Sequence, residues 1–400
     1  MQTRLPPSLL QTPAGRKADA ILRACVHCGF CNATCPTYQL LGDELDGPRG
    51  RIYQIKRLLE GAPVTATTRL HLDRCLSCRS CETTCPSGVR YHELLDIGRE
   101  RVESAAPRTP WQRLQRRLLL ALFPETRRFA LTMRLAQLAA PLLPAALRGR
   151  LPSRPRPAPL PRPGRHSRKV ILLDGCVQPV LRGGINAHLI RLLDRLGIET
   201  VVAPEAGCCG AMAQHLADPT LARRQMRANI DAWWPHIEAG AEAIVSTASG
   251  CGLMLKEYGE LLADDPAWAD RATRVSALAR DVVELLENED PEALRPARPR
   301  TIAFHPPCTL QHGQRLDGRV EALLRRLGFT LTPVADRHLC CGSAGTYSLF
   351  QPAIATALRD DRLEKLRAGD PELIATANIG CQEHLRGGSD RPVVHWIELL

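Results

Sequence analysis

Residues 25–36 read CVHCGFCNATCP, and residues 75–86 repeat the pattern as CLSCRSCETTCP. In each copy, three cysteines are separated by two residues, and a fourth follows three residues later, directly before a proline. Three thiolates at this spacing can wrap one face of a [4Fe–4S] cube, while the fourth, followed by proline, is turned toward a second cube. The pair of motifs therefore predicts two [4Fe–4S] clusters in the first quarter of the chain.

The fourth cysteines are expected to be exchanged between the two motifs. We predict that the first cluster is held by Cys25, Cys28, Cys31 and Cys85. The second cluster is then held by Cys75, Cys78, Cys81 and Cys35. This exchange forces the motifs together in space, as an electron relay requires. The alternative is a pair of four-thiolate zinc sites, which usually lack the third closely spaced cysteine and the Cys–Pro ending.

A second repeat fills the C-terminal half, and its two copies are here called the CCG modules. In each copy a single cysteine is followed, after 31 residues, by a Cys-Cys-Gly triplet and later by one more cysteine. The first copy contributes Cys176, Cys208, Cys209 and Cys251, and the second contributes Cys308, Cys340, Cys341 and Cys381. All sixteen cysteines of the chain belong to one of the two repeats.

Strand and helix patterns alternate around the CCG cysteines. In the first copy, residues 169–176, 198–204 and 241–251 read as strands and residues 185–197 as a helix, and the second copy matches. Such alternation implies right-handed crossovers and parallel strands, whose carboxyl ends share one rim of a sheet. The four cysteines of each copy should therefore converge. We expect an iron–sulfur cluster or a thiol-based redox centre in each copy; reduced thiols lining a docking cleft are the alternative.

The length of 400 residues suggests several domains. We predict an α+β and α/β chain with four parts: a helical, ferredoxin-type two-cluster domain at 1–100, a basic connector at 101–168, and CCG modules at 169–297 and 298–400. The connector ends in a Pro/Arg-rich string at 151–168, which should be extended.

The connector also carries the net positive charge, since residues 101–169 hold 16 Arg and Lys against only Glu103 and Glu125. A basic connector between near-neutral modules, with 4% aromatic residues overall, argues against a nucleic-acid partner. Its arginines between 111 and 134, with intervening Leu and Phe, predict an amphipathic surface helix. This helix could contact anionic lipid or a partner subunit, or simply pack with a solvated basic face.

Several absences narrow the function. The sequence contains no GxGxxG, GxxxxGK[ST], GxSxG or HExxH motif, so no nucleotide site and no catalytic residue is predicted. No secretory segment and no apolar run of membrane-spanning length is found, which favours the cytoplasm. Four histidines near the CCG cysteines are interpreted as structural rather than as ligands: His215, His305, His338 and His384. Trp233 and Trp234 are assigned to the core.

The chain resembles the iron–sulfur subunits of glycolate oxidase (glycolate dehydrogenase). The resemblance rests on RACVHCGFCNATCPTYQLLGDELDGPRGRIYQIK, LDRCLSCRSCETTCPSGVRYHELLDIGR, EAGCCGAMAQH, NIDAWWPHIEAGAEAI, TASGCGLMLKEYG and HLCCGSAGTYSLFQP, which spread over nearly the whole chain except 101–168. It implies two flavin-domain partner subunits carrying FAD, which oxidise glycolate to glyoxylate. This chain would then pass electrons towards a membrane quinone, as a cytoplasmic subunit peripheral to the inner face of the membrane.

Weaker resemblances leave alternatives open. The two N-terminal strings are similar to iron–sulfur subunits that serve D-lactate or glycerol-3-phosphate dehydrogenases, and the CCG modules are similar to those of heterodisulfide reductases. The heterodisulfide-type module offers five cysteines and ends in CxxC, whereas here Ala248 and Asn378 stand three residues before the last cysteine, and Met254 and His384 three residues after it. The four-cysteine modules therefore argue against a stand-alone heterodisulfide-reductase-like enzyme. A zinc-stabilised interaction protein is the remaining alternative.

Overall fold

The N-terminal part of the chain is helical. The computed structural model describes residues 1–106, 108–142, 157–296 and 298–400. Seven α-helices and two 3₁₀ turns make up the first described stretch: α1 (Pro7–Leu10), α2 (Pro13–Ala24), η1 (Phe30–Asn32), α3 (Pro36–Leu41), η2 (Glu44–Asp46), α4 (Pro48–Leu59), α5 (Ala66–Asp73), α6 (Ser80–Thr84) and α7 (Tyr91–Ala105). Proline opens several of them, because its fixed φ and missing N–H suit the first turn. Leu22, Ile55 and Leu94 form the centre of a small core between α2, α4 and α7.

The connector begins with two helices rather than the single helix expected over 111–134. Helix α8 (Pro110–Leu122) and helix α9 (Thr126–Ala139), followed by η3 (Ala140–Leu142), are separated at Pro124. Phe123 still has helical backbone angles, but proline lacks the N–H that would continue the helical hydrogen-bond ladder, which explains the break. Phe129 and Met133 of α9 are buried in the core of the CCG modules, so this segment is not wholly a surface element.

Only part of the Pro/Arg-rich string is described. Residues 151–156 lie outside the described residues, whereas residues 157–166 form neither helix nor strand, as expected for their proline content.

Each CCG module contains a four-stranded parallel sheet. The first has the order β2-β1-β3-β4, with β1 (Arg168–Leu172), β2 (Ile198–Val201), β3 (Ala243–Ser246) and β4 (Ala279–Asp281). The second repeats it as β6-β5-β7-β8, with β5 (Thr301–His305), β6 (Thr330–Leu331), β7 (Leu373–Thr376) and β8 (Val393–His395). The parallel α/β expectation is confirmed, but the strands are shorter than predicted and each sheet has a fourth strand that the sequence did not reveal.

Helices cover both faces of these sheets. The first module adds α11 (Gln178–Arg182), α12 (Gly184–Arg195), α13 (Ala211–His215), α14 (Pro219–Glu238), α15 (Ser249–Leu261), α16 (Ala269–Leu278), α17 (Val282–Leu286) and α18 (Pro291–Leu294). The second adds the π-helical turn η4 (Thr309–Gly313), α19 (Arg319–Arg326), α20 (Tyr347–Phe350), α21 (Pro352–Arg367), α22 (Ile379–Arg386) and η5 (Trp396–Leu399). Alternate residues of β1 face opposite cores: Val170 packs with Leu189 of α12, whereas Ile171 packs with Trp233 of α14. Trp234 is only partly buried.

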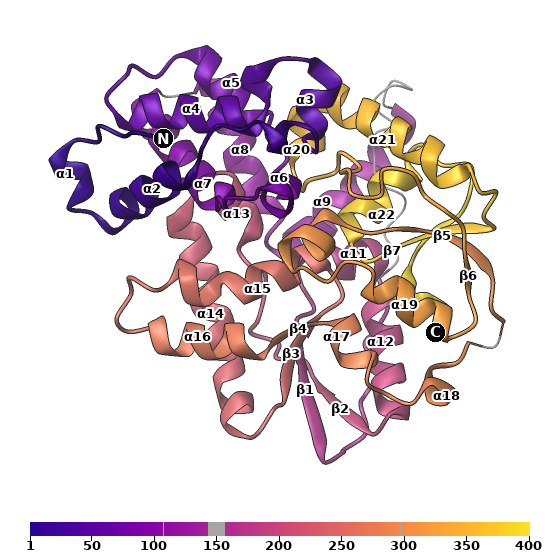
Figure 1. Cartoon of the computed structure of the whole chain (residues 1–400). Coiled ribbons are helices and arrows are strands. Elements are labelled where there is room, and N and C mark those ends of the chain that lie inside the picture. Colours follow the sequence, from indigo (N-terminus) through magenta and orange to yellow (C-terminus); the bar gives the residue numbers. More distant parts are fainter. Residues whose placement is uncertain (107, 143–156, 297) are drawn as a thin grey trace.

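The two modules share a core and join at their cysteine-bearing ends. One continuous hydrophobic cluster contains Val245 of the first sheet together with Phe304 and Trp396 of the second module. A backbone hydrogen bond connects the segments that follow β3 and β7: the Ser249 amide donates to the Ala377 carbonyl at 3.1 Å. Figure 1 shows the two sheets side by side.

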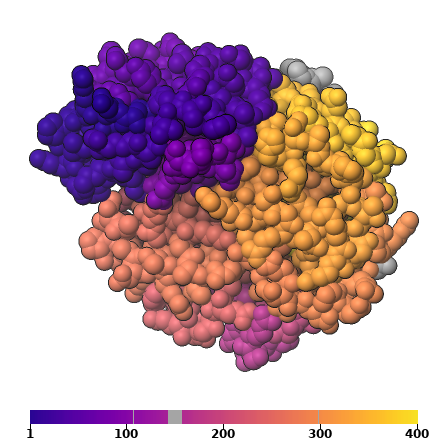
Figure 2. All heavy atoms as spheres, in the orientation of Figure 1, coloured from indigo at the N-terminus to yellow at the C-terminus, as the bar shows by residue number. Residues whose placement is uncertain are grey.

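The N-terminal helices lie across both modules, as Figure 2 shows on one face of the molecule. Toward the first module, Arg79 pairs with Glu257, and Gln214 donates a hydrogen bond of 3.0 Å to Asp96. Toward the second module, the Tyr347 hydroxyl donates to the Arg74 carbonyl at 3.1 Å. The second cysteine motif, through Cys75 and Cys78, therefore faces the rim where the CCG cysteines converge.

Candidate iron–sulfur sites

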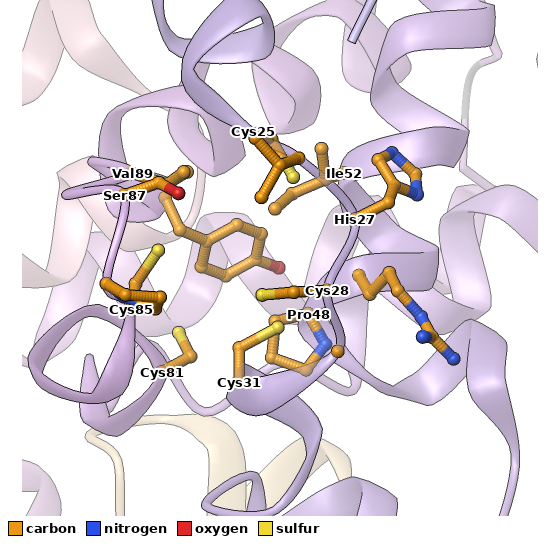
Figure 3. Close-up of a pocket in the computed structure, with 15 residues that line it drawn as sticks. Cys25, His27, Cys28, Cys31, Pro48, Ile52, Cys81, Cys85, Ser87 and Val89 are labelled. Carbon is orange, nitrogen blue, oxygen red and sulfur yellow. The ribbon is translucent and has the colours of Figure 1, made fainter.

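A first cavity gathers thiols from both N-terminal motifs. Its walls include Cys25, Cys28 and Cys31, which lie between α2 and α3, and Cys85, which follows α6. Figure 3 shows these sulfurs pointing into one space, with Cys81 beside them. The geometry thus brings Cys85 to the other motif's triplet, as the exchanged pattern requires, while ligation itself stays a prediction.

A second cavity has the complementary set. Cys75, Cys78 and Cys81 line it together with Cys35, which stands immediately before α3. Cys81 lines both cavities and so lies between them. The two predicted clusters would consequently be neighbours within one helical unit.

The loops that carry the triplets share a backbone conformation. His27 and Ser77, each two residues after the first cysteine of its motif, have φ of 57° and 53°. Gly29 and Arg79, two residues further on, also have positive φ, at 85° and 61°. Left-handed backbone is uncommon for residues other than glycine, and its recurrence at matching positions marks a functional loop. In the second loop the Ser77 amide donates to the Cys75 sulfur at 3.5 Å.

The thiols of these cavities fit a cationic iron–sulfur core. Burial raises the pKa of Cys31 to about 11 and the pKa of Cys78 and Cys81 well above the usual thiol range. None of the sixteen cysteines, all within the described residues, is in a disulfide. Buried thiols can ionise only if a neighbouring positive charge offsets the lost hydration, and bound iron provides that charge. A [4Fe–4S] group held here would supply one-electron transfer.

A buried ion network, which the sequence did not reveal, supports the second cavity. Arg51 lines this cavity and donates to Asp46 at 3.3 Å, to Thr37 Oγ1 at 3.1 Å and to the His71 carbonyl at 2.8 Å. Burial alone would lower its pKa, but the negative charge of nearby groups, Cys75 foremost, holds the pKa of Arg51 above its usual value. This fixed positive charge favours thiolate ligands beside it.

The CCG cysteines converge on one cleft of about 510 Å³ between the modules and the N-terminal helices. All eight of them line it, and so do Cys75 and Cys78. Neighbouring thiols influence one another's pKa in the order Cys176, Cys208, Cys209, Cys251 in the first module and Cys308, Cys340, Cys341, Cys381 in the second, which shows that they lie close together. The expected convergence within each module is therefore present, whereas the identity of a bound group stays a prediction.

The last cysteine of each module lies in a helix rather than at the end of a strand. Cys251 is in the first turn of α15, and Cys381 is in the first turn of α22, where the Asn378 side chain accepts a hydrogen bond from the Gly380 amide. The expected strand 241–251 is thus confined to 243–246. Asn378 caps α22 at its start, whereas α15 begins after Ala248 without a side-chain cap; in both helices the early start brings the cysteine back over the rim.

The second cavity adjoins the second CCG module. Cys78 packs against the cluster formed by Leu76, Cys308, Cys340 and Tyr347. Burial raises the pKa of Cys78, and the negative charge of Cys308 raises it further, because the two thiols lie close together. A relay through the N-terminal motifs would therefore lead toward the CCG cleft.

Three of the four histidines near the cysteines have ordinary surroundings. Burial lowers the pKa of His215 to about 4, and His384 Nε2 lies 3.1 Å from the Ala355 carbonyl. His338 is partly exposed. His305 differs, because it is fully buried close to two CCG thiols.

Comparison with known families agrees with the two repeats. The family described as 4Fe-4S dicluster domain matches residues 21–89, and the family described as Cysteine-rich domain matches residues 170–256 and 302–386. The "Glycolate oxidase iron-sulfur subunit" of Escherichia coli (strain K12) is 55% identical over 405 residues, covering 100% of this chain and 98% of the relative. The chain belongs to the glycolate oxidase iron–sulfur subunit family.

Members of this family and proteins beyond it show graded similarity. The "Probable glycolate oxidase iron-sulfur subunit" of Bacillus subtilis (strain 168) is 30% identical, and the match covers 96% of this chain and 94% of the relative's length. "Lactate utilization protein A" of Geobacillus thermodenitrificans (strain NG80-2) is 29% identical and covers only 58% of this chain and 98% of its own length. The full-length match thus separates the glycolate oxidase subunits from the lactate-utilisation proteins.

The fold of this family member also has a distant structural counterpart. A hypothetical protein from Helicobacter pylori superposes with a TM-score of 0.54 at 10% identity, over 97% of this chain and 72% of the other. Among the described residues, no helix has the length and apolar character that crossing a membrane requires.

Proposed function

We propose that this chain is the electron-transfer subunit of a membrane-associated complex that oxidises glycolate to glyoxylate. Two partner subunits, each with a flavin domain that binds FAD, would remove the electrons from glycolate, and the complex would deliver them to a quinone. The observation that carries this proposal is the 55% identity over the whole chain to a glycolate oxidase iron–sulfur subunit. The two adjacent thiol-lined cavities supply the groups that such a role needs.

The linings of the two cavities support the proposed ligand sets. We assign Cys25, Cys28, Cys31 and Cys85 to one [4Fe–4S] cluster and Cys75, Cys78, Cys81 and Cys35 to the other. Cys176, Cys208, Cys209 and Cys251 would hold a further cluster or act as a thiol redox centre. We keep the boundaries 1–100, 101–168, 169–297 and 298–400 as the proposed division into functional parts; residue 297 itself lies outside the described residues.

The exposed side of the first cavity is suited to receive a flavin partner. Cys28 is exposed there, and Val26 and Phe30 beside it are 67% and 62% exposed. By contrast, the second cavity faces the CCG modules: Cys78 packs against the second module, and Cys75 and Cys78 also line the CCG cleft. Exposed apolar side chains around a redox site mark a docking surface, so the partner's flavin domain would approach at Cys28.

The experiment that tests the proposed function is substrate-dependent reduction of the purified complex. Glycolate should bleach the broad visible absorbance of the chain and produce paramagnetic resonance signals of reduced clusters, while D-lactate or glycerol 3-phosphate should do so poorly. Iron analysis should give about 8 iron atoms per chain from the N-terminal motifs, and more if the first CCG set is loaded. Faster reduction by D-lactate or glycerol 3-phosphate would contradict the assignment to glycolate. A colourless, iron-free chain would contradict the electron-transfer role altogether.

The membrane-facing element would be the helix pair α8–α9. Its exposed apolar side chains include Trp111, Leu131, Leu135 and Leu138, the last of which is 77% exposed. Arginines alternate with them, among them Arg113 and Arg134. An apolar face flanked by basic residues suits the interface of an anionic bilayer.

Replacing Leu131, Leu135 and Leu138 of α9 by serine should weaken binding to anionic vesicles severalfold. Each leucine contributes buried apolar area to the bilayer contact, and the core residues Phe129 and Met133 stay in place. Cosedimentation with vesicles containing phosphatidylserine measures the effect. A matched triple change on exposed leucines elsewhere, Leu40, Leu41 and Leu349, is the control. Equal binding by both variants would instead favour simple packing of α9 with a solvated basic face.

A further inference from the structure

His305 differs from the other histidines near the CCG cysteines in its burial and its surroundings. It is the last residue of β5 and is 0% exposed, and neither of its ring nitrogens has a hydrogen-bond partner among the described residues. Its ring lies beside the thiols of Cys341 and Cys381, so that one nitrogen and the two sulfurs are all within 4.8 Å of one another. Buried polar groups are nearly always paired, and an imidazole without a protein partner next to two thiols is suited to bind a cation.

The first module shows that this position does not require histidine for packing. Residue 305 stands three residues before Cys308, and the corresponding position before Cys176 is Leu173, a fully apolar core residue. The same strand end can therefore be filled by leucine. A histidine at that place in the second module, aimed at the thiols of that module, carries a chemical rather than a packing role.

The spacing of the three ligand atoms fits a single ion. Tetrahedral zinc, with bonds of about 2.0–2.3 Å to nitrogen and sulfur, brings its ligand atoms to roughly 3–4 Å from one another. Each thiolate on an iron–sulfur cube binds a different iron atom, so the sulfurs stand farther apart than around one ion. Two thiolates with one imidazole also form a donor set that selects zinc.

We propose that His305, Cys341 and Cys381 bind one Zn²⁺ ion in the second CCG module. A fourth ligand is available from the cleft, which Cys341 and Cys381 both line and to which Cys340 also contributes its thiol. Zinc has no redox chemistry. The bound zinc would hold α22 and the Cys-Cys-Gly turn against β5. It would thereby stabilise the part of the second module against which Cys78 packs. The proposal departs from the cluster or redox centre expected for this module, and it holds whether or not the chain carries electrons from glycolate.

The test is metal analysis of the full chain, purified without oxygen, together with X-ray absorption at the zinc edge. The wild-type chain should contain about one zinc per chain in addition to its iron, and the absorption spectrum should show imidazole and sulfur scattering. His305→Leu, which installs the residue of the first module, should lose zinc to a chelator at least tenfold more readily. Cys381→Ser should lose it likewise.

Two controls keep the result specific. Cys251→Ser changes the matching cysteine of the first module, and His384→Gln changes a neighbouring histidine that contacts the Ala355 carbonyl; both should retain zinc. The iron content and visible absorbance of all four variants show whether the N-terminal region is still folded. The proposal is overturned by a wild-type chain without zinc, by a zinc spectrum without imidazole scattering, or by undiminished zinc retention in His305→Leu.

Discussion

A Cys28→Ser variant is expected to stop electron transfer from glycolate to quinone while glycolate still reduces the flavin of the partner. Serine is a poor ligand for iron because its hydroxyl is not ionised at neutral pH, whereas a thiolate is stabilised by the metal. Loss of a direct ligand should exceed the roughly 100-fold that loss of a supporting residue costs. Flavin reduction should persist, because the proposed function places FAD and the glycolate site on the partner subunits and the sequence contains no GxGxxG or GxxxxGK[ST] motif. Stopped-flow absorbance of the complex separates the two steps.

The exchanged cysteines give this experiment its internal comparison. Cys85→Ser should lose the same resonance signal as Cys28→Ser, because both thiols line the first cavity. Cys35→Ser should instead resemble Cys78→Ser, which changes the second cavity. Ser87→Ala, which alters a wall of the first cavity without removing a thiol, is the control. If Cys85→Ser matched Cys78→Ser, the exchange would be wrong; if Cys28→Ser blocked flavin reduction, this cysteine would serve assembly or substrate chemistry.

Asp46→Ala should produce the largest loss of stability among single changes outside the cysteines. The Asp46 carboxylate is 0% exposed and is contacted by Arg51 at 3.3 Å, Arg74 at 2.8 Å and His71 at 3.0 Å. Its removal leaves the buried guanidinium of Arg51 without its counter-charge, which costs about 3–5 kcal/mol. The free energy of unfolding is measured by circular dichroism in urea, with cluster absorbance followed in the same titration.

Asp43→Ala is the matched control for this change. Asp43 lies three residues away and caps η2 by accepting from the Leu45 amide. Its carboxylate also lies within 4.8 Å of the Asp46 carboxylate and the His71 ring, but no hydrogen bond joins it to them, so its loss should cost about 1 kcal/mol. A double variant, Asp46→Ala with Arg51→Met, should recover part of the stability, since the unpaired charge is then gone. Equal destabilisation by Asp46→Ala and Asp43→Ala would show that the buried network does not stabilise the second cavity.

Much of the site could be predicted because its chemistry is encoded in spacing. The Cys-x-x-Cys-x-x-Cys-x-x-x-Cys-Pro pattern dictates which thiols lie together, and the gathering of Cys85 with Cys25 follows from it. The parallel sheets were also predictable, since strands that alternate with helices leave little other choice. Convergence of the CCG cysteines then follows from the common rim of the sheet.

Other features depend on contacts that spacing does not express. Strands β4 and β8 are only three residues long, too short for a periodic signal, and the break between α8 and α9 depends on Pro124. In the sequence, Asp46 and Arg51 look like ordinary surface charges. They are buried only because α4 and α5 pack together in the fold. The position of His305 beside Cys341 likewise arises from the fold of the second module.

The unequal enclosure of the two N-terminal cavities bears on how the proposed clusters would be inserted. Cys28 is exposed, so iron and sulfide could reach the first cavity from solvent after folding. Cys78 is partly buried and packs against Leu76, Tyr347 and the thiols of Cys308 and Cys340. We therefore expect the proposed second cluster to be inserted before the C-terminal half packs against it, and to be harder to rebuild afterwards.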